Sequence, residues 1–159
     1  MKLFISGIPC SGKTSFGEWL ATQRGYLHVD LENKLTRKRL GIGDTLPFPR
    51  DLPARIARMA EKVIVTWGFP PRPQSLAEVR AFQAAGFTPW WFAADLAHAR
   101  ARYLKRDGEA AAAGAFDRQV GNIEREWDQI RPLYDGRIVT TLGPKEYQKR
   151  PAILDRLTQ

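Results

Sequence analysis

The stretch GIPCSGKTS, residues 7–15, constrains the fold of this chain more than any other segment. It fits the pattern Gly, four residues, Gly, Lys, Ser/Thr, in which a glycine-rich loop wraps the phosphates of a nucleotide. The apolar run KLFIS, residues 2–6, precedes the loop and predicts a buried strand, while Phe16, Trp19 and Leu20 follow it at helical spacing. This order predicts a phosphate-binding loop at the start of an α/β domain.

Each position of the loop has an expected role. Gly7 and Gly12 let the backbone bend around phosphate oxygens, and the N–H groups between them form a nest for anions. We expect Lys13 to reach the β- and γ-phosphates, Thr14 to place its hydroxyl on Mg²⁺, and Ser15 to contact the α-phosphate. The predicted nucleotide-binding residues of the loop are Gly7, Ile8, Pro9, Cys10, Ser11, Gly12, Lys13, Thr14 and Ser15.

Four more apolar runs alternate with helical segments along the chain. They predict strands at 26–30, 63–67, 88–94 and 137–142. Alternation of this kind predicts an α/β fold of three layers, with a five-stranded parallel sheet covered by helices on both faces. We expect Ser75 and Glu78 to form a capping box, Asp95 to cap the helix after the fourth strand, and residues 107–114 to interrupt that helix.

Composition narrows the classes of protein and partner. A length of 159 residues fits one domain, and the net charge of +8 favours anionic partners. Nucleic acid is the less favoured of these, because aromatic residues do not interleave with basic ones as a stacking platform requires. The single cysteine excludes an intramolecular disulfide, and no apolar run is long enough to span a membrane. We expect a cytoplasmic monomer or small homo-oligomer.

Other nucleotide-binding classes lack their motifs here. The sequence ENKLT begins like the base-reading motif of GTPases but has Thr36 where that motif needs Asp, and no strand ends in DxxG. No apolar strand ends in the paired Asp-Glu of the larger motor ATPases. Of the nucleotide-binding classes considered, the small phosphotransferases therefore remain.

Two carboxylates follow the second predicted strand in HVDLEN. Asp30 ends the strand and Glu32 lies two residues later, so both point toward the mouth of the expected site. One carboxylate is enough to hold Mg²⁺ or to accept the proton of an acceptor hydroxyl, because phosphoryl transfer depends mainly on positioning and charge neutralisation. The alternative is that Asp30 only caps the next helix.

The segment RYLKR places Arg102 and Arg106 on one face of a helix, at positions i and i+4. The Gly/Ala-rich stretch after it and Arg118 complete a candidate lid, about residues 102–118, whose arginines close over a triphosphate. Arg102 and Arg106 are therefore candidate catalytic residues together with Lys13 and Asp30. The alternative is a solvated basic helix face.

The acceptor is expected to bind between residues 31 and 61 and at the end of the third strand. Arg37 and Arg50 belong to a dense group of basic residues in that segment, which favours an anionic acceptor. Gly68, directly after VIVTW, allows close approach of a substrate to the backbone. The predicted acceptor-binding residues are Glu32, Arg37, Arg50, Gly68 and Arg118. A solvated basic helix and a simple turn are the alternatives.

The chain resembles the small P-loop kinases, the group of adenylate, shikimate, gluconate and antibiotic phosphotransferases. The resemblance rests on GIPCSGKTS, on Asp30-Leu-Glu32 after the second strand, on TWGFP after the third and on RYLKR in the lid region. It implies the strand order 2-3-1-4-5, ATP with Mg²⁺ as phosphoryl donor, and Thr14 and Asp30 as metal-binding residues. Adenylate kinases have an acid where this chain has Trp67, so the resemblance does not imply a nucleoside monophosphate as acceptor.

We therefore expect an ATP-dependent kinase that phosphorylates a small, anionic acceptor such as a nucleotide or a hydroxylated metabolite. Two alternatives stay open. The net charge of +8 is also compatible with a kinase acting on nucleic-acid ends. The replacement of the acid by Trp67 is also compatible with a non-catalytic module that binds ATP and regulates a partner.

Overall fold

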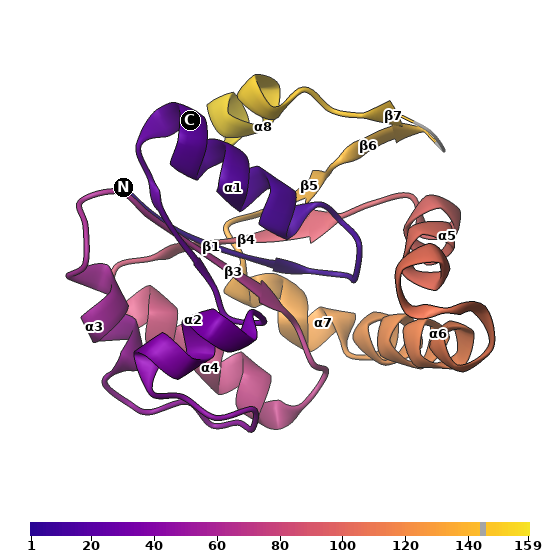
Figure 1. Cartoon of the computed structure of the whole chain (residues 1–159), viewed down its shortest axis with the longest axis horizontal. Helices are drawn as coiled ribbons and strands as arrows, with labels where there is room; N and C mark the ends of the chain where they lie inside the picture. Colours follow the sequence, from indigo (N-terminus) through magenta and orange to yellow (C-terminus); the bar gives the residue numbers. More distant parts are fainter. Residues whose placement is uncertain (144–145) are drawn as a thin grey trace.

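A five-stranded parallel sheet forms the centre of the computed structural model, with the strand order β2-β3-β1-β4-β5 (Figure 1). This is the predicted order, and the α/β fold with helices on both faces is confirmed. The structure describes residues 1–143 and 146–159, with the side chains of 109–113 and 143 left aside. Strands of the sheet are β1 (Lys2–Gly7), β2 (Leu27–Asp30), β3 (Val63–Gly68), β4 (Thr88–Ala93) and β5 (Gly136–Val139).

Helices cover both faces of the sheet (Figure 1). α1 (Lys13–Arg24) and α8 (Arg150–Leu157) lie on one face, and α3 (Leu52–Ala57), α4 (Pro73–Ala84) and α7 (Trp127–Ile130) lie on the other. The short helix α2 (Lys34–Leu40) follows β2, and the 3₁₀ turn η1 (Arg131–Leu133) follows α7. The three-layer arrangement buries apolar side chains on both sides of the sheet.

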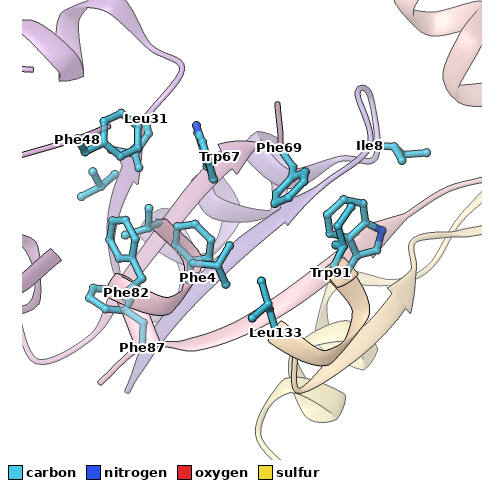
Figure 2. Close-up of a cluster of buried hydrophobic side chains, with 14 of the residues drawn as sticks. Phe4, Ile8, Leu31, Phe48, Trp67, Phe69, Phe82, Phe87, Trp91 and Leu133 are labelled. Carbon is cyan, nitrogen blue, oxygen red and sulfur yellow. The ribbon is translucent and has the colours of Figure 1, made fainter. Parts of the chain in front are cut away.

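Alternation along β1 divides the core into two parts. Phe4 points into the larger cluster under α3, α4 and α7, whereas Leu3 and Ile5 point into the smaller cluster under α1 and α8. Such alternation follows from the period of two in a strand. Figure 2 shows the larger cluster, where Phe4 stacks on Phe82 with ring centroids 4.5 Å apart and Trp67 packs near Phe48. Trp67 and Trp91 are therefore core residues.

Gly7 ends β1 where the sheet leaves no room for a side chain. It pairs with Gly68 of β3 and with Phe92 of β4. A Cβ atom on Gly7 would lie 1.9 Å from the backbone oxygen of Phe92. Real atoms do not approach so closely, so this glycine is required by the contact between neighbouring backbones as well as by the loop that follows.

Two helices project beyond the carboxyl ends of the strands (Figure 1). α5 (Leu96–Asp107) and α6 (Glu109–Arg125) meet at Gly108, and a double hydrogen bond from Arg100 to Asp117, at 2.9 and 3.1 Å, ties them together. A two-stranded antiparallel ribbon, β6 (Thr141–Gly143) with β7 (Glu146–Tyr147), extends from β5 on the same side. These elements surround the end of the sheet where the phosphate-binding loop lies.

Three local predictions were wrong, although the cap at Asp95 is confirmed by its hydrogen bond from the N–H of His98. Ser75 and Glu78 lie inside α4 rather than at its start, because Pro73 and its neighbours extend the helix backward. Helix α6 begins at Glu109, so only Gly108 interrupts the predicted helix. The predicted strand 137–142 divides into β5 and β6 around Thr140.

Within residues 1–143 and 146–159, no helix combines the length and the apolar character needed to cross a lipid bilayer.

Candidate nucleotide and acceptor site

The loop between β1 and α1 is folded in a conformation that collects backbone N–H groups. Gly12, the residue before α1, has φ of 86°, and Cys10 has φ of 57°, both in the left-handed region. The Ser11 hydroxyl donates to the Ile8 carbonyl at 2.9 Å, and the Thr140 hydroxyl donates to the Ser11 carbonyl at 2.9 Å. The loop is thus fixed from inside and from Thr140, the residue between β5 and β6, and it opens at the positive end of α1.

Lys13 is buried within this loop. Its ammonium group donates to the carbonyl oxygens of Ile8 at 2.8 Å and Gly7 at 3.3 Å. Burial lowers the pKa of Lys13, and the nearby carboxylate of Glu32 opposes that shift more than the other acidic groups do. A buried cation whose hydrogen bonds within the described residues go to neutral carbonyls can pair with an anion such as a phosphate.

Thr14 and Asp30 form a polar pair beside the loop. The Thr14 hydroxyl donates to one carboxylate oxygen of Asp30 at 3.1 Å, and the other oxygen accepts the N–H of Glu32 at 2.9 Å. Helix α2 is capped by Asn33, which accepts from the N–H groups of two following residues, so Asp30 does not cap it. A hydroxyl and a carboxylate at this separation are ligands of the kind that Mg²⁺ prefers.

Glu32 reaches across to the end of the next strand. A Cβ atom on Gly68 would lie 2.3 Å from Oε1 of Glu32, so the missing side chain of Gly68 makes the space for this carboxylate. Glu32 also influences the pKa of Lys13. The carboxylate therefore lies between the end of β3 and the phosphate-binding loop.

These groups open into one cleft of about 1020 Å³, lined by the loop, α5, α6 and the β6–β7 ribbon. Predicted site residues that line it are Pro9, Cys10, Ser11, Gly12, Lys13, Thr14, Ser15, Glu32, Gly68, Arg102 and Arg106. Gly7, Ile8 and Asp30 do not line the cleft but contact residues that do. The carbonyls of Gly7 and Ile8 accept from Lys13, and Asp30 accepts from Thr14.

The two lid arginines face the loop from α5. Arg106 is close enough to alter the pKa of Lys13. The hydrogen bond to Asp107 raises the pKa of Arg106, and partial burial opposes that shift. Arg102 donates to the Tyr147 hydroxyl at 2.9 Å and lies 5.2 Å from the centre of its ring. The helix therefore aims two permanent positive charges at the cleft.

Three arginines that were expected to bind the acceptor lie outside the cleft. Arg37, Arg50 and Arg118 are not among the described residues that line it. Arg37 donates to the carbonyl of Leu31 and, at 2.7 Å, to Asp44, so it holds the segment after β2 in place. The other two arginines have exposed side chains.

Several residues that line the cleft lie outside the sequence-based prediction, among them His98, Tyr147 and Gln119. His98 and Tyr147 share a hydrogen bond at 2.8 Å, and Tyr147 comes from the β6–β7 ribbon, which the strand pattern did not separate from β5. His98 lies one helical turn before Arg102, a spacing that placed it on the same face. Gln119 donates to the carbonyl of Phe69 at 3.3 Å, and no sequence signal distinguishes it from an ordinary helix residue.

Comparison with known proteins gives matches in structure only. No protein-family model matches the chain, and no curated protein matches it in sequence. A shikimate kinase from Bacteroides thetaiotaomicron superposes with a TM-score of 0.67 at 13% identity, over 99% of this chain and 96% of the other. A deoxyadenosine kinase from M. mycoides with bound dATP gives 0.61 at 13% identity over 100% of both chains. A gluconokinase from Sinorhizobium meliloti 1021 gives 0.54 at 17% identity over 97% and 87%.

These matches span nearly the whole chain, including its five-stranded sheet and the phosphate-binding loop. The protein therefore has the fold of the small P-loop kinases, as the resemblance of its motifs predicts.

Proposed function

We propose that the protein transfers the γ-phosphoryl group of ATP to a hydroxyl group of a small acceptor. The observation that carries the proposal is the convergence of Lys13, Glu32 and Arg106 on one cleft beside the phosphate-binding loop. Positive charges that meet a migrating phosphoryl group, together with a carboxylate that accepts a proton, are the components that this reaction requires.

The loop is suited to the triphosphate. Its backbone N–H groups would bind the phosphate oxygens, and Lys13 would exchange its carbonyl partners for them. Thr14 and Asp30 would hold Mg²⁺, which neutralises charge on the phosphates when it is bound. The oxygen atoms of both side chains already lie 3.1 Å apart, which fits a shared hard cation.

Glu32 is the group best placed to accept the proton of the acceptor hydroxyl. Its carboxylate lies beside Gly68 and is near enough to Lys13 to affect the pKa of that lysine, which supports a position next to the transferred group. Arg102 and Arg106 on α5 would neutralise the negative charge of the phosphoryl group and exclude water from the cleft. Phosphoryl transfer depends on such positioning more than on covalent chemistry.

Trp67, which stands where adenylate kinases have an acid, is compatible with the proposed kinase activity. Its side chain is buried among Phe4, Phe48 and Phe69 and points away from the cleft. The carboxylate at the end of β3 is supplied by Glu32 from the neighbouring segment. This geometry supports a catalytic protein over a non-catalytic module that binds ATP. The kinase names of the matched structures add support.

An acceptor screen tests the proposal. ATP consumption is measured with and without each member of a panel of nucleosides, nucleotides, sugars, polyols and hydroxy acids, and the phosphorylated product is identified by its mass. We expect acceptor-dependent turnover that Lys13→Ala reduces by at least 100-fold. Lys38→Ala, a change of the same kind on an exposed helix outside the cleft, should retain it. Equal turnover by Lys13→Ala would exclude this site.

A further inference from the structure

The end of the cleft at β3 carries two side chains that offer oxygen acceptors to a ligand, Glu32 and Gln119. Glu32 presents a carboxylate at Gly68. Gln119 uses its Nε2 to donate to the carbonyl of Phe69, the next residue along the chain, which leaves its Oε1 as an acceptor. Both side chains therefore approach the same two-residue segment from opposite elements, Glu32 from the loop after β2 and Gln119 from α6.

Two basic residues of the segment 31–61, Arg37 and Arg55, bind other parts of that segment. Arg37 is held by Leu31 and Asp44. Arg55 donates to the carbonyl of Leu40 at 2.6 Å and pairs with Asp51. Their guanidinium groups fix the shape of the segment after β2, so they support Glu32 instead of binding a ligand.

Three of the five cations that line the cleft in the described part of the chain lie at the phosphate-binding loop, and Lys105 and Arg150 line it from α5 and the start of α8. Lys13 lies inside the loop, Arg106 affects the pKa of Lys13, and Arg102 is bound to Tyr147, whose ring lies 3.9 Å from the Cβ position of Gly12. A second anion at Gly68 would meet the carboxylate of Glu32 at close range. Such an encounter is unfavourable unless one of the two groups binds a proton.

We infer that the acceptor is a hydroxylated compound without a carboxylate or phosphate of its own, held by hydrogen bonds that it donates to Glu32 and Gln119. The inference rests on the proposed function and specifies its substrate class. Neutral polyols, sugars and nucleosides, and hydroxylated amines, offer the required O–H and N–H donors. In the reaction, the acceptor oxygen forms a bond to the γ-phosphorus as the bond to the β-bridging oxygen breaks. ADP leaves, and the hydroxyl proton passes to Glu32.

Matched acceptor pairs test this inference, with ATP and Mg²⁺ present throughout. The pairs are glucose with gluconate, glycerol with glycerate, adenosine with AMP, and a hydroxylated amine with the corresponding hydroxy acid. We expect at least one neutral or cationic member to be phosphorylated with kcat/KM at least tenfold above that of its anionic counterpart. Preference for the anionic members would overturn the inference and leave the kinase assignment intact. Transfer to no member would contradict the proposed function, and the inference would fall with it.

A charge change at the acceptor end supplies an independent readout. Gln119→Lys places a cation beside Gly68, so it should shift the ratio of kcat/KM toward the anionic member of each pair by at least tenfold. Gln129→Lys introduces the same charge on an exposed position of α7 and should leave the ratio unchanged. An unchanged ratio in Gln119→Lys, with folding confirmed by circular dichroism, would show that the acceptor does not bind at Gln119 and would overturn the inference.

Discussion

The carboxylate of Glu32 occupies the space that a side chain on Gly68 would fill. The distance from Oε1 of Glu32 to a Cβ atom on Gly68 would be only 2.3 Å. Glu32 belongs to the segment after β2, and Gly68 ends β3, so the fit depends on the pairing of two neighbouring parallel strands. Through this contact, strand β3 fixes the position of the proposed proton acceptor without supplying a carboxylate itself.

The first prediction concerns Gly68→Ala. The added methyl group meets the end of a flexible side chain rather than backbone, so we expect a loss of stability below about 1 kcal/mol. Displacement of Glu32 should lower kcat by about tenfold to 100-fold while ATP binding is retained, because misplacement of a reacting group by about 1 Å is costly. Denaturant unfolding, calorimetric binding of ATP and steady-state kinetics measure the three quantities. Unchanged kcat would contradict the role of Glu32.

The second prediction is the contrasting result for Gly7→Ala. Here the methyl group meets the backbone oxygen of Phe92 at 1.9 Å, and neither strand can move without disturbing the centre of the sheet. We expect the free energy of unfolding to fall by about 3 kcal/mol or more. Chemical denaturation of both glycine variants gives the comparison. If Gly7→Ala is as stable as Gly68→Ala, the packing of β1 against β4 described above is wrong.

The third prediction separates metal binding from folding at Asp30. Asp30→Asn removes the negative charge but keeps both contacts, because its oxygen can accept the N–H of Glu32 and its NH2 group can donate to the Thr14 hydroxyl, so the loop should stay folded. We expect the Mg²⁺ concentration that half-saturates ATP binding to rise by about 10- to 100-fold. Titration calorimetry of ATP at a series of Mg²⁺ concentrations measures it. Asp51→Asn, which alters an exposed carboxylate outside the cleft, is the control. Identical Mg²⁺ dependence in both variants would exclude Asp30 as a metal residue.

The fourth prediction concerns pH and His28, whose ring packs against Gly17 and shares a hydrogen bond with Thr66 at 2.8 Å. Burial lowers the pKa of His28 below its usual 6.5, with partial opposition from Asp30 and Glu18. Between the lowered pKa and 6.5 the unfolded chain binds more protons than the folded one, so the contribution of His28 to stability rises with pH and is lost on acidification through this window.

The test compares the wild type with His28→Gln. The difference between their free energies of unfolding, measured in denaturant at pH 5.0, 6.0 and 7.5, removes the titration of all other groups. We expect this difference to favour the wild type more at pH 7.5 than at pH 5.0. A difference that does not change with pH would show that His28 has the same proton affinity in both states.

Much of the fold could be predicted from local sequence. The phosphate-binding loop, the alternation of apolar runs with helices, and the resemblance to small P-loop kinases gave the sheet and its order, because these signals lie within short segments. The capping-box pattern of Ser75 and Glu78 predicts a later start for α4 than the observed Pro73, because the two residues fit that pattern locally. In the structure, Glu78 instead accepts the N–H of Phe48, a contact thirty residues away that no local pattern contains.

The residues of the candidate site also fall into two groups, those that local spacing predicts and those that only tertiary contacts place. Lys13, Thr14, Arg102 and Arg106 were predictable, because fixed spacing along one helix or loop places them. Arg37 was assigned to the acceptor from its charge alone, whereas its partners Leu31 and Asp44 are set by how the following segment folds back. Tyr147 and Gln119 enter the cleft from the β6–β7 ribbon and from α6, so their roles depend on tertiary contacts between distant elements.

The most direct measurement of the central claim follows the γ-phosphoryl group itself. ATP labelled in that group is incubated with the protein, Mg²⁺ and the best acceptor of the screen, and the label is located by mass spectrometry. We expect labelled acceptor with the wild type, and a loss of at least 100-fold with Lys13→Ala although that variant remains folded. Label found only in free phosphate, or transfer that is undiminished in Lys13→Ala, would contradict this expectation.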